Sequence, residues 1–422
     1  MSTSRYVASS ASTPWPTLFL IVGAGVVSAF QIGKAPAALG DLRADLGFGL
    51  VTAGWVISMF NVIGVALGTA LGAFSGWMGE RRAVLSGLAL TASASLLGAV
   101  AQGPVLLLAT RFVEGLGFLL VAIGVPALII RLARPADLQL AFGVWGTYMP
   151  AGTAAMMMAS PLFLGPFGWR GLWIANAVLV AAFALALGFA TREIAAIPAR
   201  AHASAQSLRG LFADMRTTLA ARGPLLVALT FASYTLQFIA VLGFLPTVLM
   251  EQEGMGQARA ATLTAIAIAA NAVGNLVAGA LLHRGVARWL LVASASAVMG
   301  VCSLGIYSSA LSLPARYLLV LLFSAIGGML PATVLGWAPA MAPEPRLVPT
   351  SNGLLVQGSH LGQMIGPPAL AAMAVASGSW AWSPSLLVVS AACGVGLALS
   401  LRHLERSHAR KSAQRQATSA GC

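Results

Sequence analysis

The chain has 422 residues, of which 58% are hydrophobic and 8% are charged, and its formal net charge at pH 7 is +13. Soluble domains carry about 25% charged residues, so a chain this poor in charge cannot cover its surface in water and is predicted to lie mostly in a lipid bilayer. The basic residues fall in short segments between apolar runs and in the C-terminal tail. No basic stripe interleaved with aromatics appears, which excludes a nucleic-acid-binding protein.

The first apolar run continues past Ala35 without a cleavage site, which predicts a retained membrane helix rather than a signal peptide. About 20 mostly apolar residues span a bilayer as a helix. On this criterion we expect an all-α membrane protein with twelve transmembrane helices. Their predicted ranges are 16–38, 50–74, 83–103, 105–131, 140–163, 171–191, 224–249, 259–283, 287–309, 315–341, 350–376 and 383–401.

A polar stretch separates the sixth apolar run from the seventh. It predicts a division of the chain into two six-helix halves joined by a linker. The expected parts are an N-terminal tail (1–15), a first bundle (16–191), a linker (192–223), a second bundle (224–401) and a basic tail (402–422).

The distribution of basic residues predicts the orientation of these helices, because cytoplasmic segments of membrane proteins are enriched in lysine and arginine. With both termini and the linker in the cytoplasm, most basic residues fall on that side. The outer segments then hold only Lys34, Arg43, Arg170, Arg259 and Arg316. We therefore expect a multi-pass inner-membrane protein with both termini cytoplasmic.

The two halves repeat one another at an offset of 210 residues. Asn61-x-x-Gly64 in the second predicted helix recurs as Asn271-x-x-Gly274 in the eighth, and the same offset relates Pro36 to Pro246. Parallel repeats of this kind are typical of transporters whose substrate site lies between the two halves.

Two segments resemble the motifs of a known family. Residues 72–82 resemble the loop signature G-x-x-x-D-R-x-G-R-R of the major facilitator superfamily, with Gly76 at the acidic position and Trp77 at the first basic one. Arg111-Phe-Val-Glu114-Gly115 is similar to the family's R-x-x-Q-G pattern. The resemblance covers essentially the whole chain. It implies a monomeric carrier in which two bundles rock to expose a central site to either side, with cyanate-permease-like and monocarboxylate-type carriers as the nearest subfamilies.

Few ionisable groups fall inside the predicted membrane helices. Placing such a group in the bilayer costs free energy, so each one is a candidate for a functional role. Arg111 and Glu114 lie one turn apart, so they predict an anion contact and a proton-coupling carboxylate, or alternatively a structural ion pair. Lys34 lies near the outer end of the first helix. It predicts a contact for an incoming anion, or alternatively a lysine that reaches the lipid headgroups.

Uncharged polar groups give further candidates. His360, with Gln357 one turn away, could carry a proton or bind the substrate, but could equally be a neutral histidine bonded to a neighbouring helix. The same choice, between a substrate contact and an inter-helix hydrogen bond, applies to the remaining candidates. These are Tyr148, Tyr234, Gln237 and Asn271.

No enzyme signature, metal site or cofactor motif is found; Gly33-Lys34-Ala35 lacks the residues of a phosphate-binding loop. We therefore expect a secondary transporter for a small solute, which is either coupled to protons or driven by the solute's own gradient. If Lys34, Arg111 and Glu114 share a central cavity, its surplus of one positive charge favours an anionic solute. The alternatives are a proton-driven exporter of cationic drugs, and a non-transporting membrane sensor or scaffold.

Overall fold

The computed structural model describes residues 13–192 and 208–420, and the regular structure of these residues is helical. The helices are α1 (Trp15–Ala37), α2 (Leu39–Leu46), α3 (Leu50–Met78), α4 (Glu80–Ala99), α5 (Pro104–Leu132), α6 (Leu138–Gly146), α7 (Tyr148–Ala159), α8 (Pro161–Ala190), α10 (Leu208–Ala220), α11 (Arg222–Glu253), α12 (Gln257–His283), α13 (Arg288–Ile306), α14 (Leu313–Gly327), α15 (Met329–Met341), α16 (Val348–Ser377) and α17 (Ser383–Ala420).

Within the described residues, ten helical segments are long and apolar enough to cross a membrane, with α14 and α15 counted as one segment. The other two predicted helices are present in a different form. The fifth is divided into α6 and α7 at Thr147, because Pro150 has no N–H to bond the carbonyl of Gly146. The eleventh is α16, a 30-residue helix whose polar residues make it less apolar than the others.

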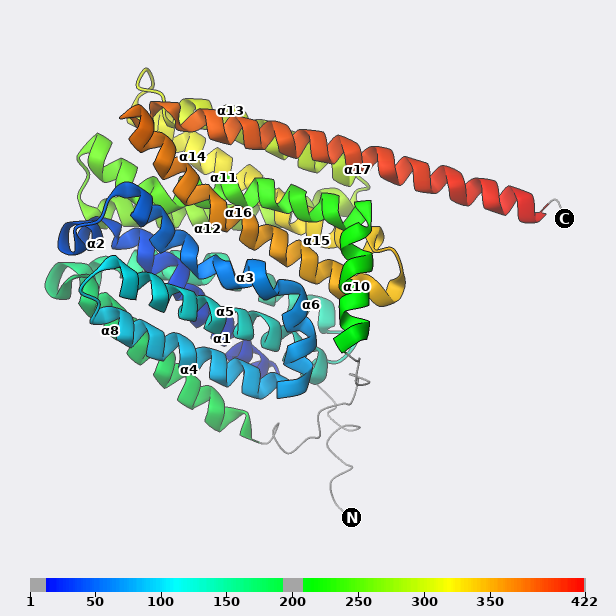
Figure 1. The fold of residues 1–422 in the computed structure, drawn as a ribbon, viewed down its shortest axis with the longest axis horizontal. Coiled ribbons are helices and arrows are strands. Elements are labelled where there is room, and N and C mark those ends of the chain that lie inside the picture. Colours follow the sequence, from blue (N-terminus) through cyan, green and yellow to red (C-terminus); the bar gives the residue numbers. More distant parts are fainter. Residues whose placement is uncertain (1–12, 193–207, 421–422) are drawn as a thin grey trace, which may run out of the picture.

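The first and second halves of the chain form two bundles that lie side by side, with all the long helices running in nearly the same direction (Figure 1). The halves meet where α3 packs along α16 and where α7 packs against α12. Glycines bring α3 and α16 close together. A Cβ atom at Gly54 would lie 2.8 Å from the Cα of Pro368, and one at Gly64 would lie 2.3 Å from the ring of His360.

At the end of the molecule that carries α2, polar side chains connect the halves. Arg43 Nη1 donates to Glu251 Oε1 over 2.6 Å, and Gln257 Nε2 donates to Asp41 Oδ2 over 2.9 Å. We call these four residues the latch. The arginine distribution predicts that the latch faces the outside.

Helix α10 was not predicted, because 13 residues are too few to span a membrane. It runs across the helix ends on the side opposite α2, the same side on which α17 projects (Figure 1). Its Asp214 forms an ion pair with Arg346, which precedes α16. The helix lies within the predicted linker.

Candidate functional site

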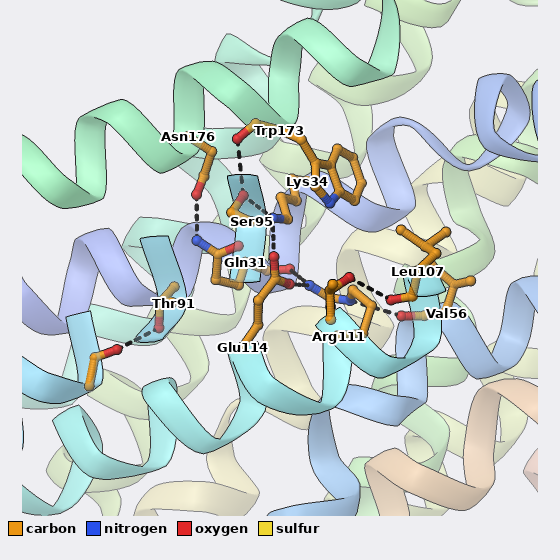
Figure 2. Close-up of polar contacts among 12 residues, drawn as sticks. Gln31, Lys34, Val56, Thr91, Ser95, Leu107, Arg111, Glu114, Trp173 and Asn176 are labelled. Atoms are coloured by element: carbon orange, nitrogen blue, oxygen red, sulfur yellow. Dashed lines mark hydrogen bonds and ion pairs between the residues drawn. The ribbon is translucent and has the colours of Figure 1, made fainter. Parts of the chain in front are cut away.

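The most extensive group of buried charges lies inside the first bundle and consists of Lys34, Arg111 and Glu114, which we call the ion network (Figure 2). Lys34 Nζ donates to Glu114 Oε1 over 2.5 Å. Arg111 Nη1 donates to Glu114 Oε2 over 2.5 Å. One carboxylate therefore binds two cations, one through each oxygen.

The local structure explains how the ion network assembles. Arg111 and Glu114 lie three residues apart on α5, so their side chains share one helix face. Gly115 lets α5 approach α3 closely, since a Cβ atom there would lie 2.0 Å from the carbonyl oxygen of Phe60. Lys34 comes from the last turn of α1.

Arg111 is held by the backbone of two other helices. Its Nε donates to the carbonyl of Val56 over 3.0 Å, and its Nη1 also donates to the carbonyl of Gln31 over 2.9 Å. The guanidinium carbon lies 5.0 Å from the ring centre of Phe60. These contacts fix the guanidinium group between α1 and α3.

Lys34 is surrounded in the same way by helices of the first bundle. Its Nζ donates to Ser95 Oγ over 2.7 Å and lies 4.5 Å from the ring centre of Trp173. Ser95 in turn donates to the carbonyl of Trp173 over 3.0 Å. Ser95 and Trp173 could not be identified from the sequence, because small hydroxyls and tryptophans are common in membrane helices.

The three charged side chains are 0–1% exposed. In this structure α4, α5 and α8 enclose Lys34, so that its side chain reaches neither the outer side nor the lipid headgroups, and its contact with an incoming anion stays a prediction. The recorded contacts of the ion network come from α1, α3, α4, α5 and α8, all in the first half. The premise that these charges line a cavity between the halves is not met.

Two buried amides extend the polar region beside the ion network. The side chain of Gln31 donates to Asn176 Oδ1. Gln31 Oε1 and Asn176 Nδ2 have no hydrogen-bond partner within residues 13–192 and 208–420. Asn176 also lines a mostly apolar hollow of about 400 Å³ between α7 and α8. Both amides interrupt apolar runs, which is the sequence signal that could have identified them.

The other predicted residues lie in separate places. His360 Nδ1 is 2.9 Å from Asn61 Oδ1 across the α3–α16 contact, and Gln357 Nε2 donates to the carbonyl of Val65 there. These two residues connect the halves.

The remaining candidates make contacts within one half. Asn271 Nδ2 donates to Tyr234 Oη over 3.0 Å, and Gln237 Nε2 donates to the carbonyl of Ser233 in its own helix. In the first half, Tyr148 stacks on Trp145 with ring centres 3.9 Å apart. The structure thus joins Lys34 to Arg111 and Glu114, but it does not unite the predicted residues in one site.

The loop that resembles the family signature is described in part. The side chains of residues 71–78, including Gly76 and Trp77, lie outside the described set. Beyond them, Arg81 Nη2 donates to the carbonyl of Gly188 over 2.8 Å, and Arg131 pairs with Glu80 over 3.3 Å. These contacts tie the loop to the ends of α5 and α8.

Residues 19–354 match the family model described as "Major Facilitator Superfamily", which covers most of the chain. The chain belongs to the major facilitator superfamily. It is therefore a multi-pass membrane protein of a family of transporters. The fold agrees with a solved bacterial homologue of the human lysosomal transporter Spinster. The TM-score is 0.75 at 14% sequence identity, and the match covers 93% of this chain and 97% of the other.

Curated relatives match over shorter stretches. The "Probable actinorhodin transporter" of Streptomyces coelicolor is 29% identical over 169 residues, which are 38% of this chain and 29% of that protein. The "Cephamycin export protein CmcT" of Amycolatopsis lactamdurans is 28% identical over 169 residues, covering 40% of this chain and 35% of the relative. The "Puromycin resistance protein pur8" of Streptomyces alboniger is 29% identical over 164 residues, covering 39% and 33%. The chain spans about a third of the length of these relatives.

Proposed function

We propose that this transporter exports lipophilic, antibiotic-like molecules and uses the proton gradient to do so. The observation that carries the proposal is the set of partial relatives, whose names concern actinorhodin transport, cephamycin export and puromycin resistance. This favours the drug-export alternative over uptake of a small anion.

The charges of the first bundle support the same choice. A carrier of small anions needs a cation that is free to bind its substrate. Both Lys34 and Arg111 are instead paired with Glu114 and buried, so binding an anion would require breaking a dehydrated ion pair. The surplus positive charge that suggested an anionic solute lies inside the bundle rather than between the halves.

For the substrate site we propose the region between the bundles that is bordered by Tyr148 and Gln357. Tyr148 belongs to an aromatic group with Trp145 and Phe118, with ring centres 3.9 Å and 6.2 Å from that of Tyr148. Aromatic faces bind flat lipophilic molecules through burial and stacking. Gln357 and His360 would add hydrogen bonds from the second half.

The test is transport by purified protein in liposomes with an imposed pH gradient. The panel contains lipophilic antibiotics, organic cations, and small carboxylic acids with their matched neutral amides. We expect the gradient to drive at least one lipophilic antibiotic against its concentration gradient, while the small acids do not move. Uptake of small acids without movement of any antibiotic would reject the proposal and restore the anion carrier. The Tyr148→Ala variant should lose affinity for the exported compound, whereas Phe167→Ala, which replaces an exposed ring elsewhere, should not.

A further inference from the structure

The positive and negative charges of the ion network do not cancel. Two cations share a single carboxylate, so with all three groups ionised the buried cluster has a formal charge of +1. An uncompensated charge in a dehydrated site is costly. Backbone carbonyls, a hydroxyl and two aromatic faces offset part of this cost without supplying a negative charge.

Only one member of the ion network can remove this charge by losing a proton. Arginine keeps its proton in proteins. Glu114 touches a cation at 2.5 Å through each oxygen, and adding a proton to it would raise the cluster to a formal +2. Loss of a proton from Lys34 instead leaves Arg111 and Glu114 as a balanced pair.

We propose that Lys34, and not Glu114, binds and releases the proton that drives transport, and that its charge state controls the latch. The inference rests on the proposed proton-driven export. In the releasing step the N–H bond of the Lys34 ammonium breaks, its electron pair stays on the nitrogen, and a water molecule accepts the proton. In the loading step the neutral amine takes a proton from hydronium. Glu114 stays ionised throughout and acts as a positioning residue.

The surroundings of Lys34 leave few rivals for this role. The charged groups that lie near Lys34 are Arg111 and Glu114, both on α5. Its neighbours on α4 and α8 are Ser95 and Trp173, which carry no charge. Helix α7 packs on α1 at Gly33 through Thr153, Met156 and Met157, and α11 approaches at Gly40 through Met250. Helix α3 reaches the ion network through Val56 and Phe60. The charged groups of α2 are Asp41, Arg43 and Asp45, which bind Gln257, Glu251 and Arg170 respectively.

Lys34 is also placed to act on the latch. It lies in the last turn of α1, where its carbonyl accepts the N–H of Ala38 over 3.2 Å. The carbonyl of Ala37, three residues after Lys34, accepts Gln257 Nε2 of the second half over 3.4 Å. The charged side chain of Lys34 ties this end of α1 to α4, α5 and α8. Loss of its charge weakens that attachment and frees the latch to open.

The experiment measures closure of the latch without any substrate. Gly40→Cys and Met250→Cys form a reporter pair across the halves, because a Cβ atom at Gly40 would lie 3.5 Å from the end of the Met250 side chain. The three native cysteines are first replaced by serine. Disulfide formation by an oxidant that reacts similarly at all pH values is then followed in liposomes from about pH 6 to about pH 10, the range in which a lysine can titrate.

We expect the cross-linked fraction to fall several-fold as the pH rises when Lys34 is present. Lys34→Arg, which keeps its charge, should cross-link well at every pH, and Lys34→Gln should cross-link poorly at every pH. His360→Gln and Arg346→Gln, the second an exposed charge paired with Asp214 on the side of the molecule opposite the latch, should keep the normal pH dependence. Normal pH dependence in Lys34→Gln, or its loss in His360→Gln alone, would overturn the assignment.

Failure of this inference can be told apart from failure of the proposed function. If antibiotics move but Lys34→Gln still accumulates them against a gradient with normal pH dependence, the proton site is wrong and export stands. If no antibiotic moves while the latch still responds to pH through Lys34, the drug assignment is wrong and the proton site stands.

Discussion

At the scale of single residues, the ion network decides between two interpretations of Arg111 and Glu114 that the sequence left open. Arg111 and Glu114 could be a self-sufficient pair or part of a larger site. The third member, Lys34, makes them part of a group with unequal charges. Removing one partner of a buried ion pair costs about 3–5 kcal/mol because the other charge is left uncompensated. The three positions therefore differ in how much stability they contribute.

Replacing Glu114 by glutamine should be the most damaging single change in the ion network, since it leaves two buried cations without a carboxylate. We expect Glu114→Gln to lower the thermal unfolding temperature strongly and Lys34→Gln to lower it only slightly. Adding Lys34→Gln to Glu114→Gln should recover part of the loss by removing one cation. Unfolding of the detergent-purified proteins, followed by tryptophan fluorescence, gives the order. An unchanged unfolding temperature in Glu114→Gln would show that the pairing contributes little.

At the scale of helices, close contacts set the position of the charged groups. A Cβ atom added at Gly115 would overlap the backbone of α3, and one added at Gly152 would overlap the carbonyl of Val26 on α1. The N-terminal bundle therefore depends on glycines in the same way as the α3–α16 contact. Helix glycines that face open space, such as Gly143, carry no such constraint.

The variant Gly115→Ala should push α5 away from α3 and draw Arg111 off the carbonyl of Val56. Inserting a carbon into a packed site costs about 1–3 kcal/mol. The matched control is Gly143→Ala, which meets no atom within 4 Å and should be neutral or slightly stabilising, because alanine favours helix by up to about 1 kcal/mol. Unfolding temperatures and yields of folded protein would check both. Equal behaviour of the two variants would contradict the packing argument.

The sequence predicted elements better than contacts. Twelve apolar runs located the helices, because hydrophobic length is a local property. The pairing of Lys34 with Glu114, 80 residues away, depends on how α1 packs against α5 and has no local signal. The 210-residue repeat also did not predict the hydrogen-bond partners of equivalent residues. Asn61 bonds His360 of the other half, whereas its counterpart Asn271 bonds Tyr234 within its own half.

At the scale of the whole molecule, the latch holds the halves together at one end with side chains that are partly exposed. Arg43 and Glu251 are 28% and 43% exposed. Exposed ion pairs are worth about 0–1 kcal/mol, so the latch can open at little cost. This suits a contact that has to break in every transport cycle.

Reversing the charge of one latch residue should shift the equilibrium toward the open latch. Arg43→Glu places two carboxylates opposite each other, and combining it with Glu251→Arg restores an ion pair with the opposite polarity. We expect the cross-linking of the Gly40→Cys and Met250→Cys pair to fall by up to about fivefold in the single variant and to recover in the double variant. No recovery in the double variant would mean that the pair does not hold the halves together.

The orientation of the molecule is a separate prediction. Reporter fusions inserted at Ala205 and attached after Ala420 should both report the cytoplasm, because the arginine-rich segments are retained on that side. A periplasmic signal from one fusion alone would overturn the helix count, and a periplasmic signal from both would reverse the orientation and place the latch in the cytoplasm.

The ion network occurs in one half only. At the offset that relates the halves, the positions of Lys34, Arg111 and Glu114 are occupied by Phe244, Leu321 and Ser324. A charge held in the hydrocarbon layer experiences the membrane voltage, which is worth about 2.3 kcal/mol per elementary charge for each 100 mV crossed. Rocking of the first bundle therefore moves charge through this electric field, whereas rocking of the second does not. The rate of transport by this protein should consequently depend on the membrane voltage as well as on the pH difference.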